Sequence, residues 1–139
     1  MEAQAILQPV VVMSLLTIAM TIWMYATRIP AMSKAGIDPT QPLDKSVLDR
    51  LPPEVTRVAD NYNHLFEQPT LFYAIALAIA VLGHVDSLHV ACAWVFTALR
   101  IAHSGVQATV NYVPVRFAIF ALSWIALALM IVREALAVF

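Results

Sequence analysis

Four long apolar windows, separated by tight turns or a proline-rich polar segment, most constrain the fold of this chain. The windows cover about residues 5–27, 65–83, 88–106 and 115–132. Each is close to the ~20 residues that a helix needs to cross the hydrocarbon core of a bilayer. Lipid cannot pair backbone polar groups, so such windows cross the membrane as helices. The pattern predicts an all-α integral membrane protein with four spans, forming one domain over residues 1–139.

Composition favours the same class of protein. The chain is 61% hydrophobic and 12% charged, whereas soluble domains carry about 25% charged residues. Its net charge is −1, and it has no basic tract, so we expect the lipid bilayer and not nucleic acid as a partner. The one cysteine, Cys92, lies in an apolar run and is interpreted as a small hydrophobic side chain.

The polar segments predict the orientation. The first loop, about residues 28–56, contains five of the eight prolines, and the pair Pro52–Pro53 predicts a helix that starts just after it. Residues 84–87 and 111–114 are expected to be tight turns. Basic residues flank the first and third loops: Arg28, Lys34, Lys45, Arg50, Arg57 and Arg116. By the positive-inside rule these loops are cytoplasmic and both termini lie outside. The first window is expected to be a retained helix and not a cleaved signal.

Four short antiparallel helices predict an up-down bundle, and polar side chains in the spans must face its interior. Such a small bundle buries little surface by itself. We therefore expect it to oligomerise, with a site at a subunit interface.

Three groups of polar residues lie near the predicted cytoplasmic ends of the spans. Steps of three and four residues place each of the first two on one side of a helix. An ionised group at bilayer depth costs about 2.5–3.5 kcal/mol, so these groups should face a polar pocket. The first group is Arg57, Asp60, Asn61, His64, Glu67 and Gln68; the second is Arg100, His103, Ser104 and Gln107; the third is Asn111, Tyr112 and Arg116.

An arginine-rich pocket inside an apolar bundle suits an anionic polar ligand, because guanidinium groups pair with carboxylates through two parallel hydrogen bonds. Next to an arginine, a bound thiol would ionise more readily and become a nucleophile. A lipophilic substrate would reach that nucleophile through the bilayer.

The same residues also have structural interpretations. Arg57 can pair with Asp60 or Asn61 at the helix mouth, and Glu67 can form a buried ion pair with Arg100. Either pair would neutralise these charges within the chain, so no ligand would be needed.

His103 and Arg116 likewise have structural alternatives: His103 can hydrogen-bond across helices, and Arg116 can anchor its helix at the interface. A metal site built from His64, Glu67 and His103 is disfavoured. Carboxylate-bridged bundles use paired Glu-x-x-His motifs, and the chain has a single copy in the reverse order.

The four-span layout and two polar segments resemble the MAPEG family, the membrane-associated proteins in eicosanoid and glutathione metabolism. Family enzymes carry Arg-x3-Asn-x2-Glu and then a proline on the second helix. Arg57 and Asn61 match its first half, with Glu67 further along; counted back from Pro69, Asn63 is the matching asparagine.

The third-helix segment resembles that of the prostaglandin synthase members, with matches at Arg100, His103, Pro114 and Arg116. Gln107 stands where that enzyme has a tyrosine, and Phe117 lacks a hydroxyl that the enzyme places there. Tyr112 stands where transferase members have an arginine.

The resemblance implies a homotrimer in a bacterial inner or organelle membrane, binding glutathione between subunits near the cytoplasmic face. The implied activity is glutathione transferase or peroxidase chemistry on a lipophilic electrophile, with Arg116 stabilising the thiolate. The residues implied to bind glutathione are Arg57, Asn61, Asn63, His64, Glu67, Arg100, His103, Gln107 and Tyr112. The alternative is a non-catalytic membrane protein that binds a small lipophilic or anionic ligand in a structural polar pocket.

Overall fold

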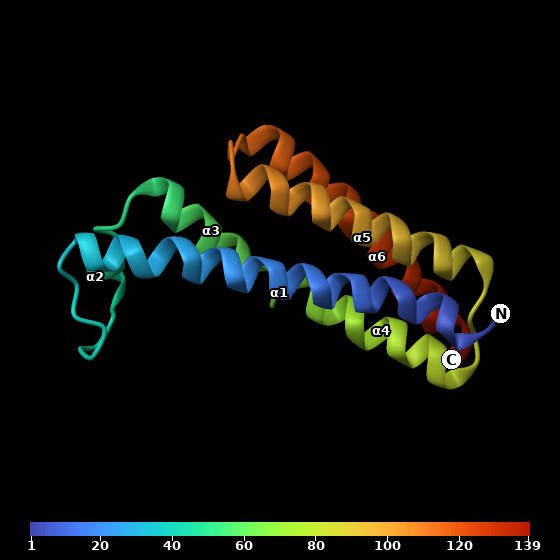
Figure 1. Ribbon diagram of the computed structural model, residues 1–139. Helices are drawn as coiled ribbons and strands as arrows, with labels where there is room; N and C mark the ends of the chain where they lie inside the picture. Colours follow the sequence, from blue (N-terminus) through green and yellow to red (C-terminus); the bar gives the residue numbers. More distant parts are fainter.

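Helix α1, residues Ala3–Lys34, is the longest element, and three of the other helices pack along it (Figure 1). The computed structural model describes all 139 residues and contains helices only, which confirms the predicted all-α class. The remaining helices are α2 (Lys45–Leu48), α3 (Pro53–His64), α4 (Gln68–Leu82), α5 (Ser87–Ala108) and α6 (Val113–Val138). Both termini lie at one end of the molecule, and α2 lies at the other (Figure 1).

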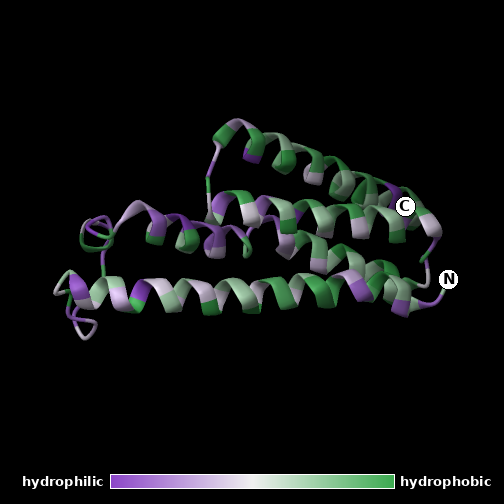
Figure 2. Cartoon of the chain, turned by 45° about the horizontal axis from the view of Figure 1, so that its top comes forward, coloured by the Kyte–Doolittle hydropathy of each residue, from purple (hydrophilic) through white to green (hydrophobic).

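Each of α1, α4, α5 and α6 packs against two of the other three. Helix α5 packs on α6 and on α1, while α4 packs on α1 and α6. The core between them is apolar and includes a stacked pair, Phe72 and Phe96, whose ring centroids are 4.5 Å apart. Hydrophobic residues predominate along the long helices (Figure 2). Many of their large side chains are exposed, as expected for helices that contact lipid.

Three helical segments are long and apolar enough to cross a membrane: α1, residues 53–82 that comprise α3 and α4, and α6. Helix α5 has 22 residues but is not among them. It carries Arg100, His103 and Gln107, and all three side chains are buried among the other helices. The three apolar segments indicate a membrane protein, as the apolar windows predicted.

The first loop is shorter than predicted. Helix α1 continues past residue 27, through Pro30, and ends at Lys34. Its last turn is held by a small second core in which Met32 and Ile37 pack on Leu51 and Val55. This long-range packing was not visible in the apolar window, which ends where the hydropathy falls.

The second span is interrupted, which corrects the prediction of one continuous helix through the first polar group. Residues 65–67 leave the helix, and their amides bond to carbonyls three residues back, including Phe66 N to Asn63 O at 3.1 Å. Pro69 explains the break, because it has no N–H to donate to the carbonyl four residues earlier, and its ring clashes there. The predicted helix start at the Pro52–Pro53 pair is confirmed.

Candidate functional site

The break between α3 and α4 separates side chains that a continuous helix would have aligned. Asn61, before the break, is fully buried, and Gln68, just after it, is almost fully buried. Glu67, at the break itself, is exposed. The break therefore directs the amide of Gln68 into the bundle while its neighbour Glu67 stays at the surface.

A cavity of about 220 Å³ lies where the end of α3 meets α5 and the start of α6. We call it the histidine cavity. His64 and His103 face each other in it, with ring centroids 6.2 Å apart, and the ring of Phe120 lies 6.1 Å from that of His103. The cavity is lined by His64, Glu67, His103, Val113, Arg116, Phe117 and Phe120.

Arg116 reaches this cavity from the first turn of α6 and is held in place by the preceding turn. Its Nη1 donates a hydrogen bond to Asn111 Oδ1 at 2.6 Å. Asn111 has a φ of 49°, in the left-handed region that asparagine tolerates better than most residues. Because that bond uses one of its five N–H donors, Arg116 keeps donors for a ligand in the cavity.

Behind the histidine cavity lies a buried polar cluster, centred on the side-chain oxygen of Gln68. Arg100 Nη1 donates to this oxygen at 3.3 Å, and Ser123 Oγ donates to it at 3.1 Å. The single hydroxyl hydrogen of Ser123 is shared between this oxygen and the carbonyl of Phe120, which lies 2.7 Å from Ser123 Oγ. These bonds connect α4, α5 and α6 through one acceptor.

Many other buried polar atoms on α3, α4 and α5 have no hydrogen-bond partner. A buried polar group left unpaired costs about 1–3 kcal/mol, so this number of unpaired atoms indicates that something else satisfies them. They include Asn61 Nδ2 and Oδ1, Gln68 Nε2, Arg100 Nε and Nη2, His103 Nδ1, Ser104 Oγ and Gln107 Oε1.

Neither of the two ion pairs that could neutralise these charges within the chain is present. Glu67 forms no ion pair with Arg100, whose hydrogen-bond partner is the neutral Gln68. Arg57 forms no ion pair with Asp60, and its Nε has no partner. The chain thus carries a buried guanidinium at Arg100 with no carboxylate paired to it.

The structure places four of the predicted site residues around one cavity. His64, Glu67, His103 and Arg116 line the histidine cavity, and Asn61, Arg100 and Gln107 lie buried. Arg57 is half-buried on α3. Two residues lie elsewhere: Asn63 lines a different cavity, and Tyr112 is 61% exposed.

Sequence reasoning gave no site role to Ser123 or Phe120. Ser123 is a lone hydroxyl in the apolar run of α6, and polar groups in spans usually bond across helices, so that signal was present. Phe120 carried no signal, because an aromatic residue in a span is ordinarily a packing residue.

The comparisons with known proteins give one match. The model of the MAPEG family matches residues 6–136. No curated protein and no solved structure matches the chain.

Proposed function

The chain belongs to the MAPEG family, and on that premise we propose that it binds glutathione and transfers it to, or reduces with it, a lipophilic electrophile. In this proposal the four long helices cross a bacterial inner or organelle membrane with both termini outside. The subunits form a homotrimer, and the histidine cavity opens toward the cytoplasm.

The observation that carries the proposal is the guanidinium of Arg100. It is 1% exposed, has two nitrogens without partners and has no carboxylate paired to it. A buried charge of this kind is costly in an apolar bundle, and an anionic ligand would offset that cost. Glutathione carries two carboxylates, one for Arg100 and one for a second cation.

Arg116 supplies the chemistry in this proposal. A positive charge next to the bound thiol favours its ionised form, which is the nucleophile. In the transfer reaction the sulfur forms a bond to an electrophilic carbon, and a bond from that carbon to a leaving group or to a neighbouring atom breaks. The electron pair of the broken bond stays on the leaving group or on the neighbouring atom, which then takes up a proton. His64 and His103 line the same cavity and are placed to carry that proton.

The size of the histidine cavity supports a shared site. Ligand pockets usually enclose about 300–1,000 Å³, and the cavity within one chain encloses about 220 Å³. A neighbouring subunit would supply the missing wall and cover part of the apolar surface of the bundle. This is why we propose a site between subunits.

Titration of the detergent-solubilised protein with glutathione tests the proposal. We expect a thiolate absorbance band to appear near neutral pH and to saturate. Arg116→Gln should abolish the band while the protein stays folded, since the side chain bonds only within its own turn.

Arg133→Gln is the matched control, because Arg133 also lies on α6 but pairs with Asp86 at the other end of the molecule. It should leave the band unchanged. Absence of glutathione binding at millimolar concentration would rule out the proposal.

One observation favours a second function, a non-catalytic binding protein that keeps the polar cluster for structure. The oxygen of Gln68 joins three helices through Arg100 and Ser123. That function predicts that Arg116→Gln changes no measured property, whereas Arg100→Ala unfolds the protein.

A further inference from the structure

A second polar cavity lies between the C-terminal part of α1, helix α2 and helix α3. It encloses about 320 Å³ and shares no lining residue with the histidine cavity. We call it the loop cavity. Its charged and polar lining consists of Arg28, Lys45, Asp49, Thr56, Asp60 and Asn63.

Helix α3 contributes one continuous strip to the loop cavity. Thr56, Ala59, Asp60 and Asn63 line it, and steps of three and four residues place these side chains on one face. Asn61, one residue beyond Asp60, is buried in the bundle instead. The loop cavity is therefore lined by a different strip of α3 from the one that carries the buried Asn61.

The charges of the loop cavity are balanced but not paired. It has two cations, Arg28 and Lys45, and two carboxylates, Asp49 and Asp60. The three ion pairs of the chain all lie at the other end of the molecule, so none joins these four. Arg28 Nε is shielded from solvent and has no hydrogen-bond partner. A ligand that carries both signs of charge would satisfy both kinds of group.

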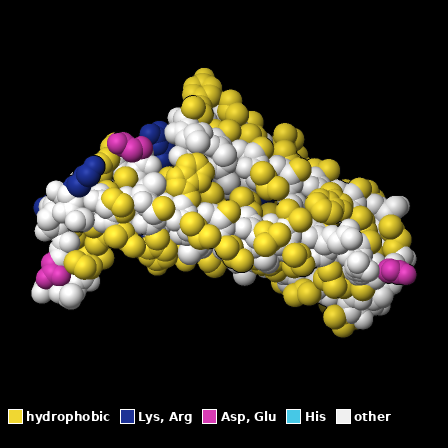
Figure 3. Space-filling model, in the orientation of Figure 1, with side chains coloured by type: hydrophobic (Ala, Val, Ile, Leu, Met, Phe, Trp, Pro, Cys, Tyr) yellow, Lys and Arg dark blue, Asp and Glu magenta, His cyan; other side chains and the backbone are white.

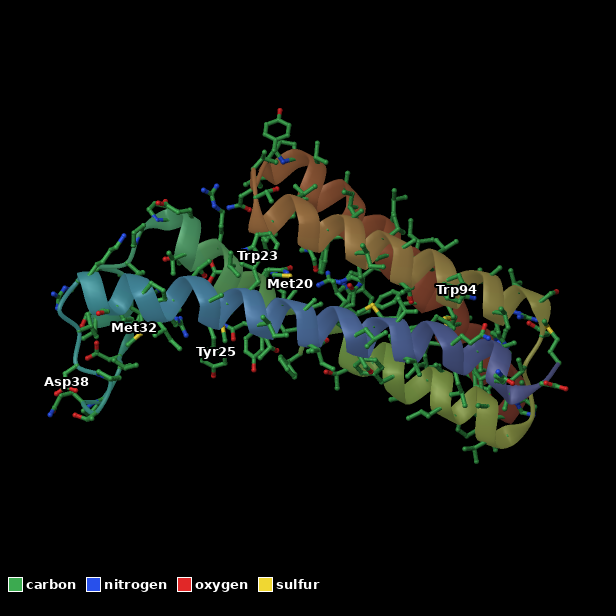
Figure 4. All side chains as sticks on the ribbon, in the orientation of Figure 1. Met20, Trp23, Tyr25, Met32, Asp38 and Trp94 are labelled. Carbon is green, nitrogen blue, oxygen red and sulfur yellow. The ribbon has the colours of Figure 1, made fainter.

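The position of the loop cavity indicates where such a ligand comes from. Basic and acidic side chains lie close together at this end of the molecule, whereas much of the face over α1 and α5 is apolar (Figure 3). The small core of Met32, Ile37, Leu51 and Val55 adjoins it, and Figure 4 labels Met32 there. For a membrane protein, this boundary between apolar helices and polar loops is the depth of lipid headgroups.

We propose that the loop cavity binds a zwitterionic group, an ammonium joined by a short linker to a phosphate or carboxylate. Arg28 and Lys45 bind the anionic part, and Asp49 and Asp60 bind the ammonium. The phosphoethanolamine headgroup of a membrane lipid has this chemistry, as do small soluble zwitterions. The site does not depend on glutathione binding.

Native mass spectrometry of the detergent-solubilised protein tests this site. The probes are short-chain phosphatidylethanolamine and phosphatidylglycerol with the same chains. We expect the zwitterionic lipid to bind about tenfold more tightly than the anionic one, since only it satisfies both signs. Lys45→Gln and Asp60→Asn should each weaken its binding by about tenfold.

The controls are Lys34→Gln and Glu54→Gln, which remove the same charges at positions that are exposed, as Lys45 and Asp60 are, but lie outside the loop cavity. They should leave lipid binding unchanged. Equal binding of the two lipids, or full binding by Asp60→Asn, would overturn the proposal.

Two further measurements separate the sources of the ligand and the two sites. If soluble phosphoethanolamine, measured by calorimetry, binds as tightly as the lipid, the ligand is a soluble zwitterion; weaker binding assigns it to the lipid. Glutathione binding should survive in Lys45→Gln, and its loss there would show that the loop cavity is not a separate site.

Discussion

Gln68 joins three helices because one amide oxygen accepts hydrogen bonds from both Arg100 and Ser123. Ser104 is equally buried, but its hydroxyl has no partner. Ser123→Ala should therefore lower the unfolding free energy by about 0.6 kcal/mol, the average for a hydrogen bond between membrane helices. Ser104→Ala should be neutral or stabilising, because it removes a buried group that bonds to nothing. Unfolding in mixed micelles measures both, and an equal loss in the two variants would contradict the assignment.

At the residue scale, Arg100 also gives a test, because its charge is buried and no carboxylate pairs with it. Replacing an unpaired buried ion by an apolar side chain of similar length is expected to be neutral or stabilising. Arg100→Met should therefore keep or raise the unfolding temperature while abolishing glutathione binding. A large drop in the unfolding temperature would instead assign Arg100 a structural role.

The polar residues themselves were predictable from sequence, because charged and amide side chains in apolar windows must face an interior. Which of them face the interior of the bundle was not predictable. Asp60 and Asn61 are adjacent, and a step of one residue turns a helical side chain by about 100°. Asp60 accordingly lines the loop cavity while Asn61 is buried, and only the packing of α3 against its neighbours decides which faces inward.

At the scale of elements, an ion pair joins the turn between α4 and α5 to the C-terminal part of α6. Asp86 accepts a hydrogen bond from the backbone N–H of His89 at 2.8 Å, which caps α5. It also accepts from Arg133 Nη2 at 2.7 Å and Nη1 at 3.0 Å. The bonds from Arg133, followed by the bond from the His89 amide, hold the pKa of Asp86 well below its ordinary value.

Two variants of Asp86 separate the cap from the ion pair. Asp86→Asn keeps a good capping side chain and loses the charge, so it should cost only a few tenths of a kcal/mol up to about 1 kcal/mol at this half-exposed site. Asp86→Ala also loses the cap, which costs about 1 kcal/mol more. Thermal unfolding at neutral pH measures both, and equal losses would mean that the cap contributes nothing.

The same lowered pKa predicts an acid dependence. The stabilisation is fully present above the ordinary pKa of 3.8 and is lost as pH falls below that value toward the folded-state pKa. The difference in unfolding temperature between the native chain and Asp86→Asn should therefore shrink as the pH is lowered through 3.8. A difference that stays constant with pH would show that the carboxylate charge is not the cause.

The helices as elements followed from the apolar windows, but two of their boundaries did not. Helix α1 continues to Lys34 because Met32 packs on residues from beyond the loop, a contact that local hydropathy does not record. The break before Pro69 was open to prediction from proline chemistry alone. The regular spacing of polar residues up to Gln68 instead favoured a continuous helix, which is wrong. Such spacing depends only on the side chains and gives no sign that Pro69 lacks a backbone N–H.

At the scale of the whole molecule, α5 decides how the chain crosses the membrane. It is not apolar enough to count as a span by itself. Its polar side chains Arg100, His103 and Gln107 are nevertheless buried among other helices. Polar residues inside membranes are tolerated when they face the interior of a bundle. We therefore expect α5 to cross, so that the turn at residues 84–86 and the turn at residues 109–112 lie on opposite sides.

Cysteine labelling on spheroplasts measures this topology. In a Cys92→Ala background, a membrane-impermeant thiol reagent should label Ser87→Cys and Phe139→Cys on intact spheroplasts. Thr40→Cys and Val110→Cys should react only after lysis, because the basic first loop is expected to stay in the cytoplasm. Labelling of Ser87→Cys and Val110→Cys from the same side would mean that α5 does not cross. The guanidinium of Arg100 would then not lie at bilayer depth, and its burial would not require an anionic ligand.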